Sequence, residues 1–137
     1  MMNISSLTEA IDDGHCADRI WFYSNYHCNL ACRYCLTESN PTVPQRVLSS
    51  DMILSLTQQA KKIGFSNIGI TGGEPFLLPW MIDSLVAVSE YAPVIVLSNG
   101  TLFRGRLLDK IGVVGILRCL SLTPRSRHRR QDHADGM

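Results

Sequence analysis

Cys28-Asn29-Leu30-Ala31-Cys32-Arg33-Tyr34-Cys35 is the stretch around which the chain is organised, and it carries three cysteines at the spacing C-x3-C-x2-C. Thiolates are soft ligands that suit iron–sulfur clusters and zinc. A loop of this length can direct three sulfurs to one side and hold three corners of a cubane cluster. An electron-carrying [4Fe–4S] cluster normally has four cysteine ligands, so three ligands would leave one iron open to a small molecule.

Strands and helices are predicted to alternate on either side of this loop. The aromatic and branched residues at 19–26 (RIWFYSNY) predict a first strand that ends where the cysteine loop begins. Further strands are predicted at 67–71, at 94–97, where a continuous apolar run indicates burial on both faces, and at 113–122. This alternation is typical of a parallel sheet with right-handed crossovers. The predicted fold class is α/β, with β/α units that curl toward a barrel.

Spacing and capping residues predict the helices between these strands. Apolar residues at 53–63 recur at steps of three and four, after an N-cap at 49–51 and before Gly64. Pro79 fits the first turn of a second helix, and residues 104–111 predict a third helix that the next glycine ends. The polar motifs then follow the C-terminal ends of successive strands, where the active sites of barrels gather.

A second polar motif follows the strand predicted at 67–71. It reads Gly72-Gly73-Glu74-Pro75, and in the cysteine loop Tyr34 places an aromatic residue directly before the last cysteine. The loop resembles the C-x3-C-x-aromatic-C loop of the radical S-adenosylmethionine (radical SAM) enzymes, and the turn resembles their GGE motif. The resemblance rests on both motifs, in the family's order and each after a predicted strand, and it covers about residues 19–123.

The resemblance implies a cofactor and a reaction. Cys28, Cys32 and Cys35 would hold three irons of a [4Fe–4S] cluster, and S-adenosyl-L-methionine would chelate the fourth iron. The reduced cluster would pass an electron to the sulfonium, and the resulting 5′-deoxyadenosyl radical would abstract hydrogen from a substrate. An electron donor such as flavodoxin or ferredoxin is implied as a partner. The family fold is a partial, six-stranded TIM-like barrel.

The resemblance also implies which residues contact S-adenosylmethionine. Glu74 would accept a charge-assisted hydrogen bond from the amino group of the methionine moiety, and the two glycines before it allow close approach to the ligand. Tyr34 would lie beside the adenine. Asn99 and Ser121, which follow or end the third and fourth predicted strands, correspond more loosely to contacts with the ribose or carboxylate. The full set of implied contacts is Tyr34, Gly72, Gly73, Glu74, Pro75, Asn99 and Ser121.

The cysteine loop alone is also compatible with other functions. It would suit three ligands of a structural zinc site, with His27 or Cys16 as the fourth, in a binding module without catalysis. It would equally suit an iron–sulfur electron carrier. His15 and Cys16 form too small a set to hold a metal by themselves, and Cys119 is interpreted as a buried apolar residue of a strand.

Composition narrows the class of protein. The chain has 137 residues, a hydrophobic fraction of 45% and a formal net charge of +1, so it fits one domain and indicates neither nucleic acid nor membrane as a partner. The sequence predicts neither a membrane span nor a signal peptide. Crowded cysteines in such a chain favour metal binding in a reducing cytoplasm over disulfides. The substrate is unknown, because the family acts on peptides, RNA, other enzymes and small metabolites.

The last part of the chain departs from the family pattern. Four strands are predicted rather than six, so residues 19–123 are expected to form a partial radical SAM core after a lead-in at 1–18. Residues 124–137 contain four arginines and no Val, Ile, Leu, Phe, Trp or Tyr, and are predicted to be a disordered tail. The strand at 113–122 would lack its next neighbour, so self-association through this edge is expected.

Overall fold

The computed structural model describes residues 4–114 and 118–120 of the chain. Its strands are β1 (Arg19–Tyr23), β2 (Asn67–Thr71), β3 (Val94–Leu97) and β4 (Arg118–Leu120), which form one sheet in the order β1-β2-β3-β4. All three pairings are parallel, so the carboxyl ends of the strands lie at the same edge of the sheet. The predicted α/β class with a parallel sheet is confirmed.

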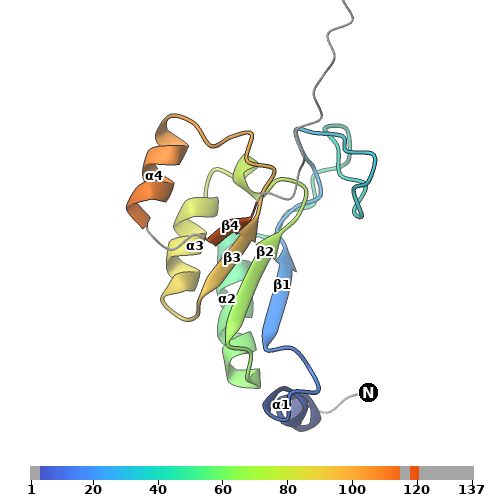
Figure 1. Cartoon of the computed structure of the whole chain (residues 1–137), viewed down its shortest axis with the longest axis vertical. Helices are drawn as coiled ribbons and strands as arrows, with labels where there is room; N and C mark the ends of the chain where they lie inside the picture. The colour runs from blue at the N-terminus through green and yellow to red at the C-terminus, as the bar shows by residue number, and fades with distance from the viewer. Residues whose placement is uncertain (1–3, 115–117, 121–137) are drawn as a thin grey trace, which may run out of the picture.

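Helices connect the strands. The described residues form α1 (Ile4–Asp12), α2 (Ser50–Ile63), the 3₁₀ turn η1 (Pro75–Leu77), α3 (Met81–Ser89) and α4 (Arg106–Val114). Figure 1 shows α1 at one end of the sheet and the long loop after β1 at the opposite end. Within the described part of the chain, none of the helices combines the length and apolar character that a membrane crossing requires.

The core lies between the two central strands and helices α2 and α3, which pack against each other. Its most deeply buried side chains come from both layers: Ile68, Ile70, Val94 and Val96 from the strands, and Ile53, Met81, Leu85 and Val88 from the helices. Burying an aliphatic side chain of this size stabilises a fold by about 1.5–3 kcal/mol. This apolar layer therefore fixes the ends of β2 and β3, from which the polar turns project.

The boundaries of α2, β2 and β3 are those that the sequence predicts. The Ser49 hydroxyl accepts a hydrogen bond from the Met52 N–H at 3.2 Å, as an N-cap residue does. Gly64 ends the helix with φ of 122°, a conformation that favours glycine. These elements follow local signals in the sequence, and the tertiary structure leaves them unchanged.

Other predicted boundaries are wrong. The first strand stops at Tyr23 rather than at residue 26, because Asn25 leaves the parallel ladder and forms an isolated antiparallel bridge with Val47. The helix α4 begins at Arg106 and continues through Gly112, where a stop was predicted. A lone glycine costs a helix only about 1 kcal/mol, which the rest of the helix can offset. Pro79 precedes α3, which begins at Met81, so its predicted place in the first turn is also wrong.

The fourth strand is short in the described structure. It covers Arg118–Leu120, whereas a strand was predicted at 113–122, and residues 113 and 114 belong to α4. Ser121 and the tail at 124–137 lie outside the described residues. Self-association through the edge of β4 stays a prediction.

Candidate functional site

The Gly72-Gly73-Glu74-Pro75 turn after β2 is bonded directly to the start of the cysteine loop. The Gly73 N–H donates to the Asn25 carbonyl oxygen at 2.9 Å, and the Glu74 N–H donates to the His27 carbonyl oxygen at 3.1 Å. A Cβ on Gly73 would lie 2.0 Å from that same His27 oxygen. Only a residue without a side chain allows the two backbones to approach this closely. Gly73 therefore allows the glycine turn to pack directly against the start of the cysteine loop, although the two motifs are far apart in the sequence.

Two residues outside both sequence motifs, Ser24 and Asn25, support this junction. Ser24 and Asn25 are both fully buried, although they are polar. The Asn25 amide nitrogen donates to the Glu74 carbonyl oxygen at 3.0 Å, and the Ser24 hydroxyl donates to the Thr71 carbonyl oxygen at 2.9 Å. The sequence feature that could have pointed to Ser24 and Asn25 is their position: two polar residues directly follow an aromatic strand. Polar side chains that are buried in this way usually have hydrogen-bond partners.

The Glu74 carboxylate is fully buried and holds two neighbouring segments. Its Oε1 accepts hydrogen bonds from the Phe76 N–H at 3.0 Å and the Ser98 hydroxyl at 2.9 Å, and its Oε2 accepts one from the Asn99 N–H at 2.8 Å. Burial raises the pKa of Glu74, while these three donors oppose the rise. The carboxylate thus connects η1 to the end of β3.

The three cysteines of the loop surround a single cavity of about 140 Å³ at the carboxyl edge of the sheet. The lining residues come from the cysteine loop and from the ends of β2 and β3: Cys28, Leu30, Cys32, Tyr34, Cys35, Ser39, Thr71, Gly73, Leu97, Ser98 and Asn99. Tyr34 is 62% exposed beside it. Glu74 is absent from this lining, since its side chain lies behind the cavity wall.

The cysteines occupy different environments. Cys28 is buried, and this burial raises its pKa, although hydrogen bonds from the Leu30 N–H and the Asn99 amide act in the opposite direction. Cys35 is half-buried, and there hydrogen bonds with Thr37 and Ser39 outweigh burial and lower the pKa of the thiol. All the cysteines of the described side chains are free thiols.

The donor set at this cavity fits an iron–sulfur cluster. Among the described residues, no three His, Cys, Asp or Glu side chains lie close enough together to hold one metal ion. The three thiols are instead arranged around a shared space. A cubane cluster takes each sulfur ligand at a different corner, and soft thiolates are its usual ligands.

Asn99 connects the end of β3 to the cysteine loop. Its amide nitrogen lies 3.5 Å from the Cys28 sulfur and donates to the Asn29 side-chain oxygen at 3.0 Å. The Asn29 amide in turn donates to the Thr101 hydroxyl at 2.8 Å. Neither Asn29 nor Thr101 was selected from the sequence, because their pairing joins positions about 70 residues apart.

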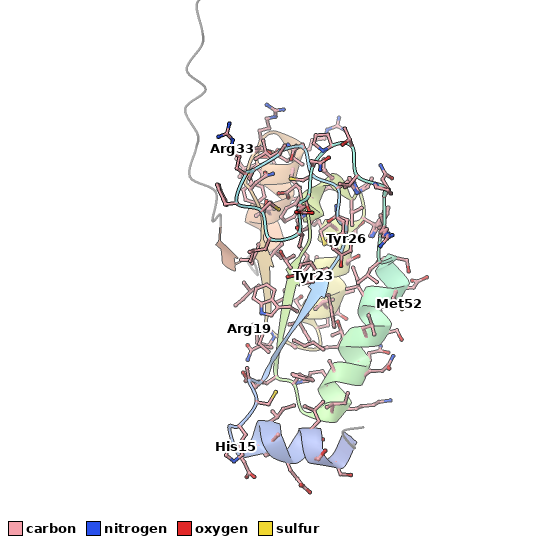
Figure 2. The ribbon with its side chains drawn as sticks, turned by 90° about the vertical axis from the view of Figure 1, so that its right-hand side faces the viewer. His15, Arg19, Tyr23, Tyr26, Arg33 and Met52 are labelled. Carbon is pink, nitrogen blue, oxygen red and sulfur yellow. The ribbon has the colours of Figure 1, made fainter. Side chains whose placement is uncertain are left out.

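Two other candidate ligands lie elsewhere. Cys16 packs against the hydrophobic core after α1, and Figure 2 shows neighbouring His15 at the opposite end of the molecule from Arg33 in the cysteine loop. Cys16 therefore does not supply a fourth ligand beside the three loop cysteines. His27 precedes Cys28 and its buried Nδ1 has no hydrogen-bond partner, but the residue does not line the cavity. The Cys119 side chain lies outside what the structure describes.

A parallel β/α sheet with a three-cysteine cavity at its carboxyl edge defines a class of protein, the partial barrels built around an iron–sulfur cluster. The family model for the radical SAM superfamily matches residues 23–125, so the chain belongs to this superfamily. Its enzymes use a [4Fe–4S] cluster and S-adenosylmethionine.

Curated relatives agree with this assignment. The GTP 3′,8-cyclase of Syntrophomonas wolfei is 30% identical over 96 residues, which cover 66% of this chain and 29% of that protein. The GTP 3′,8-cyclase of Lactiplantibacillus plantarum is 36% identical over 94 residues, or 65% and 28% of the two chains. The human molybdenum cofactor biosynthesis protein 1 is 33% identical over 65% of this chain and 15% of that protein. The chain thus spans less than a third of the length of these relatives.

A solved structure supports the fold. BtrN in complex with AdoMet and 2-DOIA matches with a TM-score of 0.58 and 22% identity, over 74% of this chain and 44% of that chain. At this identity the likeness concerns the fold, and it agrees with the predicted partial TIM-like core.

Proposed function

We propose that this chain forms the cofactor-binding portion of a radical SAM enzyme. The observation that carries the proposal is the single cavity that three cysteines, Gly73 and Asn99 line at the carboxyl edge of a parallel sheet. When bound, a [4Fe–4S] cluster supplies the electron for reductive cleavage of S-adenosylmethionine and so for hydrogen abstraction from a substrate. The reaction would take place in the cytoplasm, where thiols stay reduced.

The protein's own residues would hold and orient these groups. Cys28, Cys32 and Cys35 would bind three irons, while Gly73 would bring its backbone close to the methionine moiety. Tyr34 is exposed at the cavity, where its ring could stack on the adenine. Glu74 would support this arrangement from behind, because its carboxylate is fully buried. Ser121 remains a proposed contact from outside the described residues.

GTP is the first substrate to test. Two bacterial relatives carry the name GTP 3′,8-cyclase, and each match covers about two thirds of this chain. The match leaves more than two thirds of those proteins uncovered, so peptides, RNA, other enzymes and other small metabolites remain alternatives. Flavodoxin or ferredoxin is the proposed class of electron donor.

A zinc-binding module and an electron carrier are the competing functions. Zinc in a structural site takes four ligands in a tetrahedron, with Zn–S distances of about 2.3 Å. The cavity lining contains three cysteines and no histidine, so it does not include the fourth ligand that a structural zinc site takes. Cys28, Cys32 and Cys35 are three ligands rather than four, which favours an open iron over a simple carrier.

Anaerobic reconstitution of the full chain tests the proposal. We expect iron and sulfide to bind in the ratio of a [4Fe–4S] cluster, and we expect its electron paramagnetic resonance spectrum to shift when S-adenosylmethionine is added. Replacing Cys28, Cys32 or Cys35 by alanine should remove the cluster, because two thiolates cannot hold a cubane that already has an open iron.

Cys16→Ala is the matched control, since Cys16 lies outside the cavity lining and packs against the core. It should bind as much iron as the parent. Bound zinc in place of iron, or a cluster that survives Cys32→Ala, would refute the ligand assignment. A cluster whose electron paramagnetic resonance spectrum does not change when S-adenosylmethionine is added would favour the electron carrier.

A further inference from the structure

Two Asn-x-Thr turns in this structure have the same local geometry. In one, the Asn40 Oδ1 accepts hydrogen bonds from the Thr42 N–H at 2.9 Å and the Thr42 hydroxyl at 2.6 Å. In the other, the Asn99 Oδ1 accepts them from the Thr101 N–H at 3.0 Å and the Thr101 hydroxyl at 2.7 Å. In each, the side-chain oxygen closes a local turn, as asparagine often does.

The amide nitrogens of these two asparagines have different partners. The Asn40 nitrogen donates to the Glu38 carbonyl oxygen at 3.1 Å, close by in the chain. The Asn99 nitrogen lies 3.0 Å from the Asn29 oxygen and 3.5 Å from the Cys28 sulfur, in a loop about 70 residues away. The local turn explains the oxygen of Asn99, but it does not explain where the nitrogen is directed.

The position of Asn99 is fixed from two sides. Its backbone N–H donates to the buried Glu74 carboxylate at 2.8 Å, and its side chain bonds to Asn29, whose own amide donates to Thr101 at 2.8 Å. Hydrogen bonds that form a connected network hold their members more firmly than isolated bonds do. The donor next to Cys28 is thus held by several contacts that do not involve a cofactor.

The acceptor is the most buried of the three loop thiols. Cys28 is 8% exposed, whereas Cys32 and Cys35 are half-buried. The Leu30 N–H is a second donor to its sulfur at 3.4 Å. Hydrogen bonds to cluster sulfurs stabilise the additional negative charge of the reduced cluster and so raise its reduction potential. Partners of metal ligands also fix the orientation of those ligands.

We propose that Asn99 is a positioning residue for Cys28: its amide holds this thiol against the end of β3 and raises the reduction potential of the cluster bound there. The inference rests on the proposed function, since it requires that Cys28 bind the cluster. It gives Asn99 a task different from the contact with the ribose or carboxylate that the sequence implies. In this role Asn99 acts on Cys28, the first cysteine of the loop, and not on S-adenosylmethionine.

The test compares Asn99→Ala and Asn99→Asp with the matched variants Asn40→Ala and Asn40→Asp. Each full chain is reconstituted anaerobically, its iron is counted, and the midpoint potential of the cluster is measured by redox titration without S-adenosylmethionine. Both Asn99 variants should have a more negative midpoint than the parent. Alanine removes the donor without adding charge, and aspartate keeps the acceptor that closes the turn. Asn40→Ala should have the parent midpoint, because Asn40 contacts Cys28 through its backbone carbonyl oxygen, which accepts from the Cys28 N–H at 3.3 Å and stays in the variant. Asn40→Asp shows how far a nearby negative charge alone lowers the midpoint.

The outcomes separate this inference from the proposed function. Midpoints equal to the parent in both Asn99 variants, with full iron content, would overturn the inference while leaving the proposed function intact. A parent chain that binds no iron would refute the proposed function first. If an Asn99 variant keeps the parent circular dichroism but loses iron that the Asn40 variants retain, the positioning role is supported. If Asn99→Ala does not fold, the uncharged variant Asn99→Ser decides, because an aspartate charge beside the cluster would lower the midpoint by itself.

Discussion

The Gly72–Pro75 turn and the cysteine loop at 28–35 lie next to each other at the carboxyl edge of the sheet, but they differ in burial. Glu74 and Pro75 are among the most deeply buried side chains of the protein, and each oxygen of the Glu74 carboxylate has a hydrogen-bond partner. In the loop Tyr34 is 62% exposed, and Leu36 just beyond it is fully exposed. Figure 1 shows this loop projecting from the sheet.

This difference in burial indicates different structural roles for the turn and the loop. A buried and fully hydrogen-bonded turn keeps its geometry without a ligand, because any other arrangement would leave polar groups unpaired in the interior. The exposed loop instead takes its position from contacts with its neighbours, such as Asn99 with Asn29 in the loop and Gly73 with Asn25 just before it. The turn is therefore the fixed reference, and the cysteines are placed relative to it.

Gly73→Ala should have the largest effect, because it separates the two segments. The new Cβ would lie 2.0 Å from the His27 carbonyl oxygen, which is backbone and cannot rotate away. We expect a loss of about 3 kcal/mol in the free energy of unfolding, at the upper end of the range for overpacking. Urea denaturation followed by circular dichroism measures this loss.

Gly14→Ala is the control for this prediction. A Cβ there meets no atom within 4 Å, so the substitution costs only the strain of a φ of 74°. That strain amounts to about 1 kcal/mol. Equal losses in the two variants would show that the close approach of Gly73 to the loop does not matter for stability.

Glu74→Gln should come next in size, because it weakens the fixed turn from within. Three donors face the carboxylate, and a glutamine amide would turn its NH₂ toward at least one of them. Hydrogen bonds to charged groups contribute about 1.5–3 kcal/mol, so a loss of that order is expected. Urea denaturation of the chain without cofactors measures it, with the exposed Glu9→Gln as a control within about 0.5 kcal/mol of the parent.

The same pair of variants distinguishes two tasks for Glu74. If the carboxylate bound only S-adenosylmethionine, Glu74→Gln would leave the stability of the cofactor-free chain unchanged. Its effect would then be confined to ligand affinity, at about one to two decades for one charge-assisted hydrogen bond.

Asp18→Asn should have the smallest effect, and it concerns the opposite edge of the sheet, where β1 and β2 begin. The Asp18 carboxylate accepts hydrogen bonds from Ser66 and from the Asn67 amide at the start of β2, but it is exposed. The Ser66 hydroxyl holds the pKa of Asp18 below its ordinary value of 3.8. A lowered pKa in the folded state means that the stabilisation is present above 3.8 and is lost as the pH falls through the folded value.

Urea midpoints measured from neutral pH down to about pH 3 test this sign. The parent should lose slightly more stability than Asp18→Asn over the acidic part of this range, because the amide does not titrate. A larger acid-dependent loss in the variant than in the parent would contradict the pKa direction. Asp18→Asn and Glu74→Gln together compare an exposed acid at the start of β2 with a buried acid that follows β2.

The sequence by itself determined the elements and motifs that depend on neighbouring residues. The caps at Ser49 and Gly64, the bounds of β2 and β3 and the parallel α/β class follow from local spacing and side-chain chemistry. The three cysteines and the GGE turn were likewise evident in the sequence, because motifs of this kind are contiguous.

Only the tertiary structure decided which distant residues meet. It put the Glu74 carboxylate behind the cavity wall, Cys16 against the core, and the Asn99 amide beside Cys28. It also ended β1 at Tyr23 and carried α4 past Gly112. The physical reason is that burial and hydrogen-bond partners across 25 to 71 positions are set by the packing of whole elements. No local pattern in the sequence contains that information.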